Sequence, residues 1–198
     1  MDIKRIIIVA HPYEIGTERL LTEGFSLVSQ YEDNRLVYAN SQTAIAIIGI
    51  GADEAGRSLK AMQEEGLFSQ PVDILLTGSA GSYTLPVLST VQCSSSLSDI
   101  DMGFPRARLE CVHEFVSPSS PHPELHQPDT AFDMESETLT AFFKNNVRES
   151  VRSFSIVKVI SDDGSGSLGD WAAVCQQYVQ PRVMDVVKTF IDKTQDKA

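Results

Sequence analysis

Hydrophobic residues along the chain follow two patterns, one typical of buried strands and one typical of helices. Continuous apolar runs at 4–10, 72–77 and 154–160 predict strands that are buried on both faces. Apolar residues three or four positions apart predict helices that cover such a sheet. By this spacing we expect helices at 17–28, around 55–62, at 133–145 and from 171 to 191, the last one interrupted at Pro181.

Further strands are expected at 35–39 and 43–48, joined by a short turn, and at 86–93 and 107–116. Strands that alternate with helices, together with strand-to-strand hairpins, define the α/β class. The pattern therefore predicts a three-layer αβα sandwich around a mixed, mostly parallel central sheet. Because no repeat or linker divides the chain, residues 1–198 are expected to form a single domain.

Polar and glycine-rich segments follow the predicted strands at points that should meet. In open α/β sheets, ligands bind at the carboxyl ends of the strands. Glu14, Gly49, the segment 78–81 and Asp162 all follow predicted strands. Taken singly, Glu14 could be a carboxylate at a helix start, and Asp162 could be a turn former. Their common position at one edge of the sheet indicates a ligand site.

The acidic segment Phe132-Asp133-Met134-Glu135-Ser136 is expected to open a helix directly after a long loop. That loop, 117–129, contains four prolines, which exclude a helix and a central strand. Loops of this length inside compact domains are usually functional or mobile. Two carboxylates and a thioether are unusual choices for a segment that only begins a helix, which suggests that Glu135 binds a substrate.

Composition narrows the range of partners. The chain has 198 residues and a formal net charge of −11, which argues against nucleic acid and against an anionic membrane. The apolar run at 4–10 is too short for a signal peptide, and no segment reaches the ~20 apolar residues that span a bilayer. Three cysteines without metal-binding spacing suggest reduced thiols and a cytoplasmic location.

Two other motifs do not support a cofactor or a metal. Gly49-Ile50-Gly51 lies between a strand and a helix, as a dinucleotide fingerprint does, but Glu54 replaces the third glycine and would place a negative charge beside a pyrophosphate. A tight turn explains these glycines better. His122 and His126 are four residues apart, but the neighbouring prolines exclude a helix and no third ligand is evident. We therefore expect neither a metal nor a cofactor.

Five segments, in this order, resemble the nucleoside phosphorylase superfamily, and within it the methylthioadenosine/S-adenosylhomocysteine nucleosidases. The segment 7–15 resembles the first strand with its catalytic glutamate, and 48–51 resembles the glycine turn. The segment 72–81, VDILLTGSAG, is similar to the family's "PDvIInTGSAG". The segment 132–136, FDMES, is similar to "vEMEa", and 157–162, VKVISD, is similar to "vRaISD". The resemblance covers most of the chain and implies the sandwich fold.

This resemblance implies roles for the residues in cleaving an N-glycosidic bond. Asp162 would protonate or hydrogen-bond the purine N7, and Glu14 would orient and deprotonate the attacking water. Glu135 would accept hydrogen bonds from the ribose 2′- and 3′-hydroxyls, and Met134 would pack against the sugar. The other residues expected at the substrate are Phe132, Asp133, Ser79, Ala80, Gly81 and Ser161. A homodimer or larger homo-oligomer is expected too, because a neighbour's loop closes the pocket in family members.

The resemblance favours hydrolysis over phosphorolysis. Phosphorylases of the superfamily usually carry an Arg where Leu76 stands, although Arg57 or Arg106 could supply the phosphate-binding charge from elsewhere. The related futalosine hydrolases have Trp-containing final helices, which Trp171 echoes, but typically carry Asn in place of Asp162. The alternatives to a nucleosidase are therefore a phosphorylase, a futalosine hydrolase-like enzyme and a catalytically silent nucleoside-binding protein.

The segment that should recognise the base departs from the family pattern. The family's extra helix and its "GDaFi"-type stretch shrink here to about 103–130, and Asp133 replaces the first Glu of "EME". Phe115, Phe132 or Tyr83 could stack on the base instead. The expected substrate is a (thio)adenosine-type purine nucleoside, and the sequence leaves its exact base open.

Overall fold

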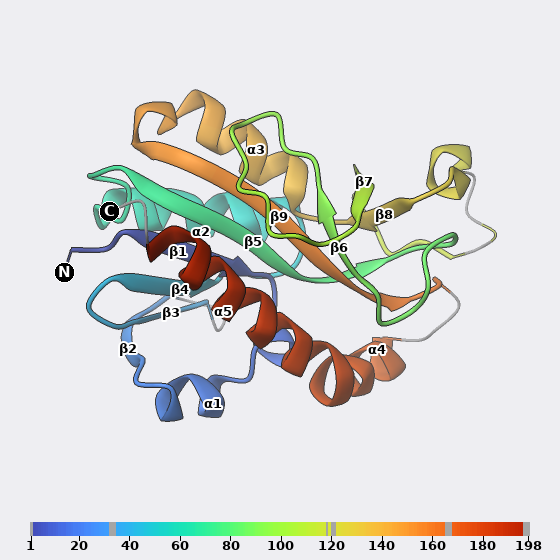
Figure 1. The fold of residues 1–198 in the computed structure, drawn as a ribbon, viewed down its shortest axis with the longest axis horizontal. Helices are drawn as coiled ribbons and strands as arrows, with labels where there is room; N and C mark the ends of the chain where they lie inside the picture. The colour runs from blue at the N-terminus through green and yellow to red at the C-terminus, as the bar shows by residue number, and fades with distance from the viewer. Residues whose placement is uncertain (1, 32–34, 118, 120–121, 165–167, 196–198) are drawn as a thin grey trace.

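A computed structural model of the chain describes residues 2–31, 35–117, 119, 122–164 and 168–195. These residues form a nine-stranded sheet with helices on both sides (Figure 1). The strands are β1 (Arg5–Val9), β2 (Ser26–Gln30), β3 (Leu36–Ala39), β4 (Thr43–Ile47), β5 (Val72–Gly81), β6 (Thr90–Cys93), β7 (Arg106–Cys111), β8 (Thr130–Asp133) and β9 (Val151–Asp162). The α-helices are α1 (Thr17–Thr22), α2 (Ala52–Glu64), α3 (Ser136–Asn145), α4 (Leu168–Val174) and α5 (Gln180–Gln195). Short 3₁₀ segments are η1 (Pro12–Glu14), η3 (Pro123–His126) and η4 (Arg148–Ser150), and η5 (Cys175–Val179) is a π-helical turn.

The strand order is β2-β3-β4-β1-β5-β8-β7-β6-β9, and β5 also pairs with β9. Within the described residues, five of the nine strand pairings are parallel, which confirms the mixed, mostly parallel sheet. The parallel strands β4, β1, β5 and β9 form its centre and are almost wholly buried. Their continuous apolar runs are those that a sheet covered on both faces requires.

Two apolar cores lie on opposite faces of the sheet and complete the three layers. One core joins alternate residues of β1 and β5, such as Ile8 and Ile74, to Leu59 of α2 and Phe143 of α3. The other joins the intervening residues, such as Ile7, to α1, η5 and α5. Figure 1 shows α5 in front of the sheet and α2 behind it. The alternation of side chains along each strand divides the two cores.

The helix predicted at 17–28 is wrong in its second half. The structure ends α1 at Thr22 and begins the edge strand β2 at Ser26, where Leu27 and Val28 remain largely exposed. Gly24, with φ +85°, lies in the left-handed region between them. The apolar spacing of 20–28 suits a helix, but antiparallel pairing with β3 decides the conformation.

The acidic segment begins as a strand rather than as a helix. Phe132 and Asp133 end β8, which pairs with β7, and α3 begins only at Ser136. Asp133 accepts hydrogen bonds from the backbone N–H and hydroxyl of Ser136, at 3.2 and 2.6 Å, and so satisfies a free donor at the start of the helix. The expected helix start at Asp133 is therefore corrected by three residues.

The small-residue segment 78–81 is the end of β5 rather than a turn after it. Its residues pair in register with β9, from Gly78 opposite Lys158 to Ala80 opposite Ile160. Ser161 and Asp162 likewise belong to β9, although the sequence predicts that this strand ends at residue 160 and that a loop follows at 161–166. Residues 165 and 166 of that loop lie outside the described residues. Both strands are longer than predicted because each supplies the other's backbone hydrogen bonds.

The remaining boundaries differ from expectation in smaller ways. The strands expected at 86–93 and 107–116 are shorter, and Asp170 lies inside α4 rather than before it. The last helical region is interrupted by the π turn η5, which directly precedes α5 and Pro181. A turn of this kind accommodates the missing proline N–H. The loop predicted at 117–129 contains η3, while Pro118 and Pro121 fall outside the described residues.

Among the described helices, none has the length and apolar composition to cross a membrane.

Candidate active site

One cavity of about 530 Å³ lies at the carboxyl ends of β1, β5, β8 and β9, and its size is typical of small-molecule sites. All ten residues predicted for the site line it: Glu14, Ser79, Ala80, Gly81, Phe132, Asp133, Met134, Glu135, Ser161 and Asp162. Lining residues from the rim are Val87, Val112, Glu114, Phe115, Val116, Asp163, Gly164, Asp170, Trp171 and Val174. Residues from across the whole sequence thus meet in one place.

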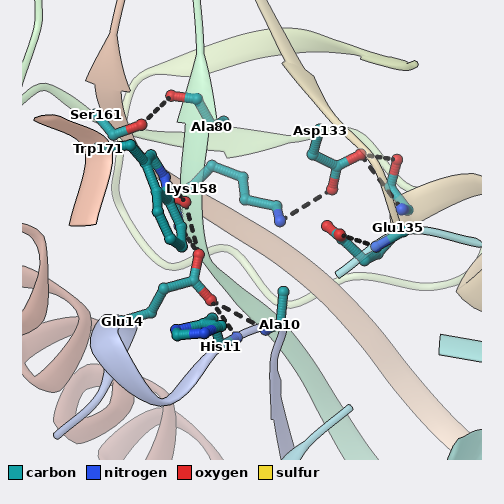
Figure 2. Close-up of polar contacts among 12 residues, drawn as sticks. Ala10, His11, Glu14, Ala80, Asp133, Glu135, Lys158, Ser161 and Trp171 are labelled. Atoms are coloured by element: carbon teal, nitrogen blue, oxygen red, sulfur yellow. Dashed lines mark hydrogen bonds and ion pairs between the residues drawn. The ribbon is translucent and has the colours of Figure 1, made fainter. Parts of the chain in front are cut away.

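Glu14 is a buried carboxylate held at both oxygens (Figure 2). Its Oε2 accepts the backbone N–H groups of Ala10 and His11, at 2.9 and 3.0 Å. Its Oε1 accepts the backbone N–H and the hydroxyl of Ser79, at 2.7 and 2.6 Å. The end of β1 and the end of β5 therefore fix this side chain together. Four donors are as many as the lone pairs of a carboxylate can accept.

Two glycines of β5 make room for neighbouring side chains. A Cβ on Gly78, whose φ is +128°, would lie 2.7 Å from the carboxylate of Glu14. A Cβ on Gly81 would lie 2.2 Å from the ring of Phe132. Real side chains do not approach so closely, so glycine is required at both positions. The small residues of this strand let a carboxylate and an aromatic ring of the protein itself approach the backbone.

Glu135 precedes α3 and is 4% exposed. Its Oε1 accepts the backbone N–H of Gly51 at 2.8 Å, so the glycine turn orients a carboxylate. Burial, reinforced by the charge of Asp133, raises the pKa of Glu135 to about 7, although Lys158 and the Gly51 N–H favour the ionised form. Positive φ angles at Gly49 and Gly51 agree with the tight turn that was predicted.

Lys158 is a fully buried cation beneath the site, and sequence reasoning missed it. Its Nζ lies 2.9 Å from Oδ2 of Asp133, which joins β9 to β8 (Figure 2). Burial alone would favour the neutral amine, but Asp133, Glu135 and Glu14 outweigh it and raise the pKa of Lys158. Both oxygens of Asp133 are therefore used inside the protein, one by Lys158 and one by Ser136. A lysine in an otherwise apolar strand was the available signal.

Asp162 ends β9 at the cavity wall and is half-buried. Its Oδ1 accepts the backbone N–H of Gly164 at 2.8 Å, and its Oδ2 lies 2.6 Å from the hydroxyl of Ser161. The same hydroxyl lies 3.3 Å from the carbonyl oxygen of Ala80. Ser161 therefore faces two oxygens with a single proton.

The three aromatic candidates for the base take different positions. Phe115, 66% exposed, and Phe132 line the cavity. Tyr83 is absent from the described lining: its ring stacks on His126, packs against Phe132 and crowds Gly164. Its hydroxyl donates to the Ser117 carbonyl at 2.6 Å. Tyr83 therefore supports the wall from behind.

The charge of the cavity is one-sided. Its described lining contains seven carboxylate side chains (Glu14, Glu114, Asp133, Glu135, Asp162, Asp163 and Asp170) and no lysine, arginine or histidine. Arg57 pairs with Glu54 on α2, and Arg106 pairs with Asp99 at 2.6 Å, so both arginines considered for phosphate lie elsewhere. No group of three or more potential metal ligands occurs among the residues that the structure describes.

Comparison with known proteins gives matches in structure but not in sequence. No protein-family model matches the sequence, and neither does any curated protein. Many solved structures, among them nucleosidases and a futalosine hydrolase, match the α/β fold that the sequence motifs implied.

Three of these neighbours show the extent of the match. The 5′-methylthioadenosine/S-adenosylhomocysteine nucleosidase of Neisseria meningitidis, in complex with methylthio-immucillin-A, has a TM-score of 0.70 and 16% identity over 98% of this chain and 99% of its own. The MTAN of Chlamydia trachomatis bound to adenine has a TM-score of 0.68 and 17% identity over 95% and 97%. The futalosine hydrolase of Helicobacter pylori has a TM-score of 0.71 and 16% identity over 98% and 99%. At these identities the likeness establishes the fold.

Proposed function

We propose that the protein is a purine nucleosidase, an enzyme that hydrolyses the N-glycosidic bond of a (thio)adenosine-type nucleoside to a free base and a ribose derivative. One observation carries the proposal: three carboxylates from distant segments, Glu14, Glu135 and Asp162, line one cavity without a cationic side chain among its described residues. Cleavage of this bond passes through a state with positive charge on the ribose, which such a cavity stabilises.

In this proposal, Asp162 is the acid that assists departure of the base. A proton delivered to the purine N7 lets the electrons of the C1′–N9 bond move into the ring. The contacts of Asp162 support this role. The hydroxyl of Ser161 donates to its Oδ2 at 2.6 Å and the backbone N–H of Gly164 donates to its Oδ1 at 2.8 Å, so the carboxyl group is held at the cavity wall.

Glu135 and Met134 would hold the ribose. Gly51 occupies Oε1 of Glu135, and the carboxylate retains acceptor positions for the two ribose hydroxyls. The residue is buried beside the cavity, where such hydrogen bonds are stronger than in water. Met134 lines the same cavity and supplies an apolar, adaptable surface. Glu14, fixed by four donors, would take the proton of the attacking water.

Hydrolysis is favoured over phosphorolysis by charge. Phosphate binding requires cationic or backbone donors, and Arg or Lys is the usual choice. In the described residues the nearest buried cation, Lys158, is paired with Asp133 and does not line the cavity. A phosphate in this cavity would face seven carboxylates. Water as the nucleophile carries no such penalty.

Two observations support a (thio)adenosine-type substrate: the apolar part of the cavity and the ligands bound by structurally similar proteins. Phe115 and Phe132 offer aromatic faces for a purine, and Val87, Val112 and Val116 extend an apolar lining. Adenine and methylthio-immucillin-A are the ligands of two neighbours in structure. A futalosine hydrolase has the same fold, but the Asp at 162 favours the nucleosidase.

The decisive experiment incubates the purified protein with methylthioadenosine, S-adenosylhomocysteine, adenosine and inosine, with and without phosphate, and measures the free base. We expect release of base without phosphate, and a fall of at least 10²-fold in turnover for Asp162→Asn at an unchanged melting temperature. Release only with phosphate would establish a phosphorylase. If the protein binds a nucleoside but releases free base from none of them, it is a catalytically silent nucleoside-binding protein.

We further propose that the protein works as a homodimer or larger homo-oligomer in the cytoplasm. Phe115 and Val87 remain exposed at the rim of the cavity, where a second copy could cover them. The cysteines are free thiols, which fits a reducing compartment. Light scattering at several protein concentrations measures the oligomeric state, and a monomer at all of them would contradict the proposed homo-oligomer.

A further inference from the structure

The acceptor capacity of Glu14 raises a question about the path of the proton. A carboxylate has about four lone-pair positions. Those of Glu14 meet the N–H groups of Ala10, His11 and Ser79 and the hydroxyl of Ser79. A water molecule that gave its proton directly to Glu14 would have to displace one of these donors.

Three of the four donors are backbone groups and cannot turn away. The two N–H groups at Oε2 belong to Ala10 and His11, which directly follow β1, and the third belongs to β5. Only the hydroxyl of Ser79 can rotate, and only it can both accept a proton and donate one. Ser79 also lines the cavity.

Trp171 fixes the orientation of this hydroxyl. Its indole Nε1 donates to Oγ of Ser79 at 3.1 Å, and Trp171, on α4, also lines the cavity. Because Oγ accepts there, its own proton is directed to Oε1 of Glu14, and one lone pair of Oγ is left for a water. The ring of Trp171 is itself held edge-on against His11, with 5.5 Å between the ring centres.

We propose that Ser79 relays the proton of the attacking water to Glu14, and that Trp171 is the positioning residue that holds Ser79 in the relay. As the water oxygen bonds to C1′, one O–H bond of the water breaks and its proton bonds to Oγ of Ser79. The hydroxyl proton of Ser79 moves to Oε1 of Glu14 at the same time. The C1′–N9 bond breaks, and its electrons leave with the base. The relay rests on the proposed hydrolysis.

The first test is Ser79→Ala, assayed with methylthioadenosine. The variant keeps the backbone N–H at position 79 and frees one acceptor position on Glu14, so direct attack would be retained or improved. The relay predicts instead a fall in kcat of about 10²-fold, the scale of one proton-transfer role. Activity within about twofold of the original would overturn the relay. A protein that releases no base before mutation would instead contradict the proposed function.

The second test separates Trp171 from general packing. Trp171→Phe keeps the ring and removes the N–H donor, which should lower kcat by about 3- to 10-fold at a similar KM, the scale of one neutral hydrogen bond. In the Ser79→Ala background the same change should have no further effect, since Trp171 acts through Ser79. An equal loss in both backgrounds would contradict the positioning role. Tyr178→Phe, an exposed aromatic on η5, is the control for folding and should change neither constant.

A proton inventory in mixtures of H₂O and D₂O gives an independent readout. If the chemical step limits kcat, two protons in flight give a curved dependence on deuterium content, and a single transfer gives a straight line. We expect a more strongly curved dependence for the original protein than for Ser79→Ala, in which one proton fewer moves, since the proton of Asp162 contributes to both. Equal curvature in both proteins would overturn the relay. Trp171 is the only tryptophan of the chain, so its fluorescence reports whether Ser79→Ala and Tyr178→Phe still bind the nucleoside, and isothermal titration calorimetry reports this for Trp171→Phe.

Discussion

The strand-end part of the cavity and its rim are built on different physical principles. Glu14, Glu135 and Asp162 lie at or just beyond strand ends and accept backbone N–H groups, so the sheet itself fixes them. The rim comes from loops and from α4, and one of its apolar side chains, Phe115, is mostly exposed. The three carboxylates are therefore rigidly supported, while the rim, where we propose that the base binds, is more exposed and more open to change. Mutations in the two parts should therefore have effects of different sizes.

Among the substitutions that compare the two parts of the cavity, the largest effect is expected for Gly78→Ala. A Cβ there would displace the carboxylate of Glu14, and displacement of a catalytic group by about 1 Å can cost about 10²-fold in rate. Gly66→Ala is the matched control, because Gly66 also has a positive φ, of +81°, and no atom lies within 4 Å of its added Cβ. Steady-state kinetics and thermal melts should show similar destabilisation in both and a loss of activity in Gly78→Ala alone. Equal activity of the two would refute the close-approach argument.

A smaller effect is expected for Glu135→Gln, and it depends on pH. Because the pKa of Glu135 is raised to about 7, its carboxylate forms as the pH rises through 7, and KM for the nucleoside should fall over that range. In Glu135→Gln this fall should be lost, and KM at pH 8 should rise about 10-fold, the scale of a hydrogen bond to a charged group. Identical pH dependence of KM in both proteins would show that Glu135 does not bind the ribose.

The same substitution should stabilise the fold at high pH. A folded-state pKa above the unfolded one means that the folded protein binds more protons between about pH 4.5 and 7, so its stability falls as the pH rises through this window. Glu135→Gln lacks that loss and should exceed the original protein by roughly 1–3 kcal/mol in unfolding free energy at pH 8, with little difference at pH 4. Denaturant melts at both pH values measure this difference.

The smallest effect is expected at the rim, for Phe115→Leu. Loss of an aromatic face should lower kcat/KM for purine nucleosides by about 2- to 10-fold and leave the melting temperature unchanged, because the side chain is not part of a core. Leu21→Ala, at an exposed position on α1 away from the cavity, is the control. A fall as large as that of Gly78→Ala would remove the distinction between the two parts of the site.

The sequence placed the strand-end residues at one edge of the sheet for a physical reason. Buried parallel strands leave continuous apolar runs, and their carboxyl ends meet at one edge, so residues such as Glu14 and Asp162 could be brought together without a structure. The sequence pattern gave a wrong prediction where pairing with another strand decides the conformation. The segment 20–28 has helical spacing, yet its second half pairs with β3.

Contacts between distant segments were also beyond the sequence. The ion pair of Lys158 with Asp133 joins two strands, and the hydrogen bond of Trp171 with Ser79 spans 92 positions. Neither pair has a fixed spacing that a pattern could reveal. The glycines of β5 can be read from the sequence, but the groups that approach them, Glu14 and Phe132, emerged only from the structure.

The identity of the sugar product formed in phosphate buffer tests the central claim most directly. Methylthioadenosine is cleaved in phosphate enriched with ¹⁸O, and the sugar is analysed by mass spectrometry and ³¹P NMR. A cavity lined by carboxylates, with water as nucleophile, predicts free methylthioribose without phosphorus or ¹⁸O label. A sugar 1-phosphate that carries the label would contradict the account.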